Sequence, residues 1–201
     1  MASHASATAG TARMTLEEWA AMPEGEPGEL VDDVLVEEEM PSYLHEFVVI
    51  WLGSVLRAWA VARGAWVAGS GTKLAVARGR GRMPDLTVYL PGAPRPQLRG
   101  LIDVPPGIAV EVVTPTPRDE RRDRVEKLRE YAAFGVKWYW LVDPELRTFE
   151  ILELGGDGRY AHAVAATEGV VENVPGCDGL CIDVSGLWAE LDALVGDPKP
   201  D

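Results

Sequence analysis

One short apolar run, residues 107–113, constrains the fold more than any other stretch of this 201-residue chain. It reads GIAVEVV, so a single carboxylate, Glu111, stands among aliphatic side chains. Such a run between turn signals is typical of a strand covered on both faces. A buried carboxylate must be neutralised, paired or bound to a cation, because an isolated buried charge is very unfavourable. The run therefore predicts a layered fold of helices on a sheet, and a chemical reason for Glu111.

The remaining sequence alternates between helical and extended patterns. We expect helices at residues 15–22, 45–64, 118–134 and after a cap at Ser185, with Phe47, Ile50, Trp51, Val55 and Trp59 on the buried face of the second. We expect strands at residues 28–39 (a hairpin turning at Asp32-Asp33), 65–77, 84–90, 107–113, 136–143, 148–154, 159–165 and 180–184, and loops at 79–83 and 91–107. This order predicts an α/β or α+β fold, a mixed central sheet flanked by helices.

Composition indicates one soluble domain. Hydrophobic residues make up 47% of the chain, which allows a sizeable core, and no stretch approaches the roughly 20 apolar residues of a membrane span. We expect a flexible leader at residues 1–14, a single domain at 15–195 and a flexible tail at 196–201. The leader lacks the apolar segment of a secretory signal, and the two cysteines are expected to be free thiols. Together these features predict a cytoplasmic protein with no membrane partner.

Charge is distributed unevenly along the chain. The formal net charge is −13, yet residues 57–137 carry 15 Lys or Arg and 8 acidic residues, a local balance of +7. A local basic surface can bind phosphate on an acidic protein, although the overall charge weakens that binding. An ordinary solvated surface explains the same charges equally well.

Three charged residues stand where apolar residues are expected. Asp85 precedes the strand LTVYL, Glu111 lies in the next strand, and Lys127 borders the apolar stripe of the following helix, marked by Val125 and Leu128. Two carboxylates at the same end of neighbouring strands would form a hard-oxygen site suited to Mg²⁺ or Mn²⁺. A nearby ammonium could orient the attacking water and offset charge on the pentavalent phosphorus.

Each of these residues also has a structural explanation. Pro84-Asp85 is a common turn pair, and Lys127 lies four residues from Asp123, the spacing of a surface salt bridge. Glu111 would be harmless on the outward face of an edge strand. The presence of all three residues in this order favours a catalytic role over a purely structural one.

This order of residues resembles the PD-(D/E)XK nuclease superfamily and, more narrowly, the Uma-type bacterial restriction endonuclease family. The resemblance covers about residues 15–190, and its most specific part is residues 109–144. The segments that carry it are GELVDDVLVEEEMPSYLHE, RMPDLTVYL and AVEVVTPTPRDERRDRVEKLREYAAFGVKWYWLVDP, followed by the meander after Pro144. The resemblance implies a restriction-endonuclease-like core and a single-domain hydrolase.

Site residues follow from the resemblance position by position. Asp85 and Glu111 match the metal-binding acids, and Lys127 matches a lysine that has moved to the helix, because Val113 stands where the superfamily has it. Glu29 matches an upstream acid that could join the metal site or orient water. The residues implied as accessory are His45, at the helix start, and Tyr131, one turn after Lys127. For His45, a helix-capping or packing role is an equal alternative. Asp32-Asp33 and EVVTPTP depart from the family pattern without removing a side chain that the chemistry needs.

The leading hypothesis is a Mg²⁺- or Mn²⁺-dependent endonuclease that hydrolyses phosphodiester bonds in DNA. Its expected nucleic-acid contacts are Arg78, Arg80, Arg82 and Arg122, with Arg118, Arg121 and Arg124 as a further set. Two alternatives remain: a nuclease fold kept as a binding or assembly module with little catalysis, and a hydrolase of a small phosphorylated substrate. An exposed sheet edge and several tryptophans make a homodimer a further expectation.

Overall fold

The computed structural model describes residues 13–23, 28–36 and 40–196. The expected leader and tail therefore lie outside the described residues, apart from Arg13, Met14 and Gly196. The helical elements are α1 Leu16–Ala20, α2 Tyr43–Val61, α3 Pro117–Arg121, the π-helix η1 Arg122–Lys127, α4 Leu128–Phe134 and α5 Val184–Val195. The strands are β1 Glu29–Val31, β2 Val34–Val36, β3 Trp66–Ala68, β4 Leu74–Ala77, β5 Arg80–Arg82, β6 Leu86–Tyr89, β7 Ile108–Val112, β8 Trp138–Asp143, β9 Thr148–Leu154, β10 Tyr160–Ala166, β11 Val170–Val171 and β12 Ile182–Asp183.

The central sheet is mixed, as the sequence predicts. Its order is β10-β9-β8-β7-β6-β3, and β7 and β8 pair in parallel while the other neighbours pair antiparallel. The two parallel strands lie in the middle, and every residue of both is buried. The continuous apolar runs of both strands follow from this position, because each strand is covered on both faces. Glu111 is therefore a carboxylate in the centre of the fold.

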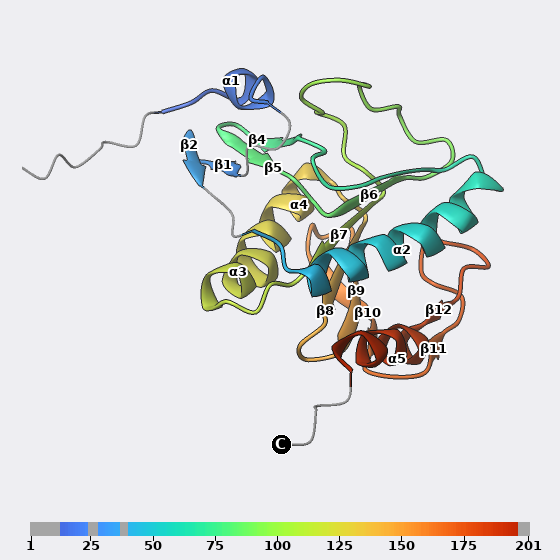
Figure 1. Ribbon diagram of the computed structural model, residues 1–201. Coiled ribbons are helices and arrows are strands. Elements are labelled where there is room, and N and C mark those ends of the chain that lie inside the picture. The colour runs from blue at the N-terminus through green and yellow to red at the C-terminus, as the bar shows by residue number, and fades with distance from the viewer. Residues whose placement is uncertain (1–12, 24–27, 37–39, 197–201) are drawn as a thin grey trace, which may run out of the picture.

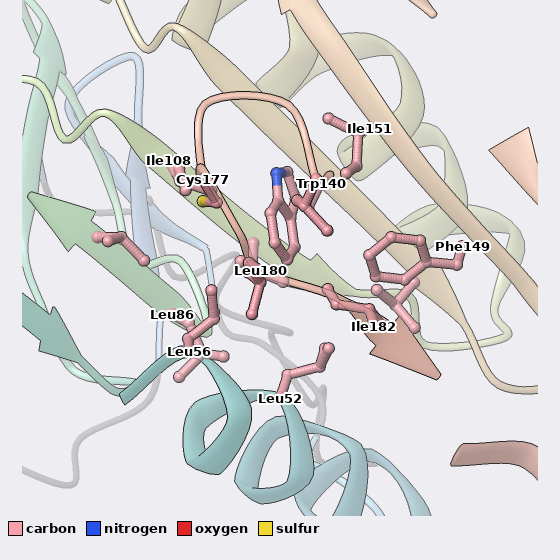
Figure 2. Close-up of a cluster of buried hydrophobic side chains, with 14 of the residues drawn as sticks. Leu52, Leu56, Leu86, Ile108, Trp140, Phe149, Ile151, Cys177, Leu180 and Ile182 are labelled. Atoms are coloured by element: carbon pink, nitrogen blue, oxygen red, sulfur yellow. The ribbon is translucent and has the colours of Figure 1, made fainter. Parts of the chain in front are cut away.

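Helices cover both faces of this sheet (Figure 1). Along β7, Ile108, Val110 and Val112 belong to the core that includes α2 and α5, while Ala109 and Val113 belong to the core that includes Tyr131 of α4. In the first core, Leu52 and Leu56 of α2 approach Leu86, Trp140 and the segment of Leu180 and Ile182 (Figure 2). Since side chains alternate along a strand, Glu111 faces the α4 side together with Ala109 and Val113.

A smaller sheet, ordered β2-β1-β5-β4, lies beside the central one. The predicted hairpin turn is confirmed: Asp32 and Asp33 both adopt positive φ, at 53° and 64°, as a two-residue hairpin requires. The expectation of a loop at residues 79–83 is wrong, because Arg80–Arg82 forms β5 between β1 and β4. Gly81 permits this packing, since a Cβ there would lie 2.2 Å from the Trp19 ring.

Two expectations about helices need correction. The buried face of α2 carries Val48, Val49, Leu52 and Leu56, whereas Ile50, expected in the core, is 66% exposed. Of the other residues expected there, Trp59 is buried and Phe47, Trp51 and Val55 are partly buried against the core, so the expected face is correct except at Ile50. In α5 the N-cap is Asp183, whose side chain accepts from Gly186 N, and not Ser185.

Length and composition alone would let α2 cross a membrane, and within the part of the chain that the structure describes it is the one helix that passes this test. The expectation that no stretch approaches a membrane span therefore needs correction for α2, whose buried residues pack in the core against the sheet. Cys177 and Cys181 are free, as expected. The absence of a membrane partner, the cytoplasmic location and the homodimer stay predictions.

Candidate active site

Two carboxylates from neighbouring strands meet at one end of the central sheet. Leu86 pairs with Val110 in the antiparallel register of β6 and β7, so the next step of the register brings Asp85 opposite Glu111. Asp85 Oδ2 accepts a hydrogen bond from the backbone N–H of Val112 at 2.7 Å, which fixes its carboxylate against β7. The sequence expectation that Asp85 and Glu111 share one end of adjacent strands is confirmed.

A helical segment delivers the other charged groups. Residues 117–134 form one continuous run in which the π-helix η1 separates α3 from α4, and Gly135 ends it at φ 99°. Four polar side chains at a spacing of four are all at most 3% exposed: Asp119, Asp123, Lys127 and Tyr131. In an α-helix, residues spaced by four drift about 40° around the axis per step. The wider π turn reverses this drift, so the four side chains stay on one face.

Lys127 is the charged centre of the site. Its Nζ lies 2.9 Å from Glu111 Oε2, 3.2 Å from Glu29 Oε1 and 3.3 Å from Asp123 Oδ1. The pair with Asp123 has the expected spacing, yet it is buried and not a surface salt bridge. Tyr131 OH donates to the other oxygen of Glu111 at 2.7 Å. The expectation that Lys127 and Glu111 come together is therefore confirmed, and Tyr131 contacts the carboxylate itself.

Arg82 binds the carboxylate of Glu29. Its Nη1 donates to Glu29 Oε2 at 2.6 Å, and its Nε donates to Glu130 Oε2 at 2.5 Å, while the side chain is fully buried. Glu29 also accepts from the backbone N–H of Met83 at 3.0 Å. We therefore correct the expectation that Arg82 contacts nucleic acid: a guanidinium without solvent access and with two carboxylate partners positions Glu29.

His45 joins the site through Asp85. Ser42 caps α2 by accepting from His45 N, so His45 is not the cap residue. The ring lies beneath the surface with Nε2 3.3 Å from Asp85 Oδ2 and Nδ1 3.6 Å from Glu46. Burial opposes protonation of the ring, but Asp85 and Glu46 outweigh it and raise the pKa of His45 above its ordinary value.

The buried carboxylates respond differently to their surroundings. Burial raises the pKa of Glu111 well above its usual range, and Asp123, Asp85 and Glu29 add to the shift although Lys127 opposes it. Burial raises the pKa of Asp123 in the same way. For Glu29, burial is outweighed by Lys127, Arg82 and Arg122, so the pKa of Glu29 is lowered. The surroundings of Glu29 thus favour its ionised form, whereas the surroundings of Glu111 disfavour its negative charge.

A cavity of about 150 Å³ opens onto this group. Its charged lining consists of five carboxylates (Glu46, Asp85, Glu111, Asp119, Asp123), two permanent cations (Arg122, Lys127) and His45. When its carboxylates are ionised, this lining repels a phosphate and attracts a cation. Among the residues that the structure describes, no three His, Cys, Asp or Glu side chains form a ready-made metal cluster.

The remaining candidate arginines differ in how far their side chains are exposed. Arg80 pairs with Asp32 and Glu130, Arg122 with Asp119 at 2.9 Å, and Arg124 with Asp143 and Glu150. The side chains of Arg118 and Arg121 are 58% and 76% exposed, at 3.9 Å from Asp119 and 3.5 Å from Glu126 respectively. Arg78 is exposed in the turn before β5. The solvent-facing candidates are thus Arg78, Arg118 and Arg121.

Sequence reasoning missed Asp119, Asp123 and Glu130 as members of the site. The signal was present, because Asp119, Asp123, Lys127 and Tyr131 repeat every four residues. It was obscured by Val125, which suggested a buried stripe but is 41% exposed.

A family model described as "Uma2: Putative restriction endonuclease" matches residues 15–185, which include every member of the site. The chain belongs to the Uma2 family. In this Uma2-family chain the match spans Glu29, Asp85, Glu111 and Lys127 together. None of the curated proteins compared with the chain matches it.

A solved structure shares the fold. It is described as a "putative nuclease belonging to DUF820 from Anabaena variabilis ATCC 29413", with a TM-score of 0.71 and 19% sequence identity over 89% of this chain and 99% of that one. The likeness shows that the Uma2-family chain has a nuclease-like fold, a mixed sheet flanked by helices.

Proposed function

We propose that this Uma2-family chain is a metal-dependent endonuclease that hydrolyses phosphodiester bonds in DNA, with Mg²⁺ or Mn²⁺ as its cofactor. The observation that carries the proposal is the convergence of Asp85, Glu111 and Lys127 on one cavity. Family membership and the nuclease-like fold support nuclease activity in general. The arrangement of the site residues supports the metal-dependent mechanism.

The donor set suits a hard divalent cation. Asp85 and Glu111 present carboxylate oxygens to the cavity, and Mg²⁺ is commonly held by one or two carboxylates together with waters and substrate phosphate. We assign both residues as ligands, with the carbonyl of Val112, which lines the same cavity, as a further donor. Burial disfavours ionised Glu111, so a cation beside it would remove the repulsion from Asp85 and Asp123. When bound, the ion would lower the pKa of a water and withdraw charge from the phosphate.

The chain's own residues would orient the reaction. Lys127, fixed by Glu29, Glu111 and Asp123, would position the attacking water and offset charge on the phosphorus. Tyr131 and Arg82 would keep Glu111 and Glu29 in place. Arg122 lines the cavity and would meet a phosphate oxygen, and the exposed Arg78, Arg118 and Arg121 would contact the DNA backbone.

One observation favours the alternative of a module with little catalysis. Lys127 already has three carboxylates within 3.3 Å, so its ammonium is fully paired without a metal. In that case the group would stabilise the fold, and removing Asp85 would leave any binding function unchanged.

A combined metal and cleavage experiment tests the proposal. Calorimetry with Mn²⁺ and a plasmid-nicking assay are performed on wild type and Glu111→Gln. Saturable binding and nicking that both disappear in the variant support the nuclease. Wild type that neither binds the ion nor nicks any DNA form contradicts it and favours the module.

A further inference from the structure

A second hollow lies beside the catalytic cavity, between α2 and the edge strand β3. This α2–β3 groove has a volume of about 690 Å³ and is lined by residues of α2, by Val67 and Leu86, and by the loop after β3. It shares Glu46 and Ser70 with the catalytic cavity. Since the two hollows share lining residues, a substrate held in one can extend into the other.

The two hollows differ in size and chemistry. The catalytic cavity, at about 150 Å³, has room for a phosphate and its waters and is lined by charges. The groove is larger. Its exposed apolar lining is mainly Ile50 and Val67, because Val49 and Leu86 are only 6% and 3% exposed, and its polar lining includes Arg57, Glu46, Ser54 and Ser70. Apolar walls suit a flat ring better than a phosphate, and Arg57 could meet the phosphate that follows.

Gly53 lines the groove at some expense to the helix. It lies inside the 19-residue helix α2, where glycine is about 1 kcal/mol less favourable than alanine. Close packing does not require it, because the nearest atom to an added Cβ would be Leu86 Cδ2 at 3.5 Å, an ordinary contact. What the missing side chain provides is space in the groove that Gly53 lines.

Glu46 lies at the junction of the two hollows. Its carboxylate can accept a hydrogen bond from a base amino group or a sugar hydroxyl, and it repels phosphate. The phosphate is thereby directed toward Lys127 and Arg122, and the uncharged part of a nucleotide toward the groove.

We propose that the α2–β3 groove binds the nucleobase next to the scissile phosphate, so that the substrate is single-stranded or locally unstacked DNA. The proposal rests on the proposed nuclease function and names its substrate class. Bases in a duplex are stacked and paired, and a base reaches a protein pocket only from a single strand or after it has been flipped out. A groove next to the cleavage cavity therefore selects for strands whose bases are free.

Filling the groove tests this proposal. Gly53→Leu adds a side chain to the groove at a helix position where leucine is a good helix former. Ala62→Leu, at the exposed C-cap of the same helix and outside both hollows, is the matched control. Thermal unfolding confirms folding of both variants. Fluorescence anisotropy measures binding of a short labelled oligodeoxynucleotide and of its duplex, and Mn²⁺-dependent hydrolysis is followed on the oligonucleotide and on bis(p-nitrophenyl) phosphate.

The expected result is tighter wild-type binding to the single strand than to the duplex, and about tenfold weaker single-strand binding by Gly53→Leu, a change near 1.4 kcal/mol. Hydrolysis of the oligonucleotide should fall more than that of the small diester, and Ala62→Leu should match wild type. Equal binding of strand and duplex, no binding of the single strand, or unchanged binding by Gly53→Leu would overturn the groove proposal. Groove-dependent binding without hydrolysis of either substrate would support the groove and contradict the nuclease function.

Discussion

Lys127 and Glu111 lie 2.9 Å apart, Nζ to Oε2, with side chains that are only 2% and 4% exposed. A buried ion pair contributes little net stability compared with an apolar pair, but removing one partner leaves a charge without compensation. The pair is further enclosed by Glu29 and Asp123, so negative groups outnumber the one lysine that they share. This imbalance is the physical basis of the predictions for Glu111 and Lys127 below.

Neutralising Glu111 should abolish activity without lowering stability. Glu111→Gln removes a carboxylate whose ionisation is opposed by burial, and glutamine can still accept from Tyr131 OH. We expect nicking to fall to background, while the melting temperature in metal-free buffer at alkaline pH stays equal to wild type or rises. Differential scanning calorimetry with and without Mn²⁺ measures this. Glu153→Gln, which removes a half-exposed partner of Lys137 on β9, should change neither property. A variant much less stable than wild type without metal would show that Glu111 is needed structurally.

Metal binding should release protons and strengthen with pH. The pKa of Glu111 is raised in the folded protein, so between its unfolded and folded pKa values the folded state holds more protons. The contribution of Glu111 to stability is fully present below its unfolded pKa and is lost as the pH rises through its folded pKa. A cation needs the ionised carboxylate, so it displaces that proton and reverses the loss.

Calorimetry can detect these released protons directly. Titrations with Mn²⁺ in two buffers of different ionisation enthalpy should give different apparent binding enthalpies. Affinity should increase as pH rises toward the folded pKa of Glu111. Identical enthalpies in both buffers would mean that the ion does not bind at a protonated carboxylate.

Removing the lysine should destabilise the fold more than it would at the surface. Lys127→Met leaves Glu29, Glu111 and Asp123 without their shared ammonium, and we expect a loss of about 3–5 kcal/mol in the free energy of unfolding. The control Lys137→Met breaks an exposed pair with Glu153, a hydrogen bond to Leu154 O and a contact with the Trp138 ring, and should change it by only about 1–2 kcal/mol. Urea unfolding at two pH values measures both. The defect should shrink at lower pH, where the raised pKa values of Glu111 and Asp123 let them bind protons.

The sequence predicted the strands of the site better than its helix. The apolar run around Glu111, and Asp85 at the start of the next strand, follow from period-two patterns that the central sheet preserves. Lys127 was singled out by its position beside the apolar stripe and by family resemblance, whereas Glu29 was assigned by resemblance alone. In the structure Lys127 Nζ lies 3.2 Å from Glu29 Oε1. These positions depend on local pattern and chain order, which one sequence contains.

What could not be predicted depends on tertiary geometry. The π-helix η1 keeps Asp119, Asp123, Lys127 and Tyr131 on the buried face of residues 117–134. Their spacing of four is visible in the sequence, but no local pattern signals the π turn that brings them together. Arg82 follows a Gly-Arg repeat that is typical of a loop, but β1 and β4 pair with it and Trp19 covers Gly81. Because distant segments pair around it, Arg82 does not contact DNA as expected but is buried and supports Glu29.

The same substitution should therefore change different properties at Arg78 and Arg82: stability at Arg82 and DNA binding at Arg78. Arg82→Gln breaks buried pairs with Glu29 and Glu130, so we expect a loss of about 3–5 kcal/mol in unfolding free energy. It should also lower kcat, because Glu29 no longer holds Lys127 in place. Arg82→Lys, which restores a charge but not the forked geometry, should recover only part of both losses.

Arg78→Gln should leave stability unchanged and weaken DNA binding. Its side chain is exposed, and a phosphate contact at that position would release one counterion, so the slope of log affinity against log salt should fall by about 1. Anisotropy titrations at several salt concentrations measure the slope for both variants, with Arg159→Gln, an exposed change in the β9–β10 turn, as the control. Arg82→Gln, once corrected for its unfolded fraction, should keep the wild-type slope because a buried guanidinium releases no counterion. A slope reduced by Arg82→Gln and not by Arg78→Gln would mean that β5 presents Arg82 to the nucleic acid after all.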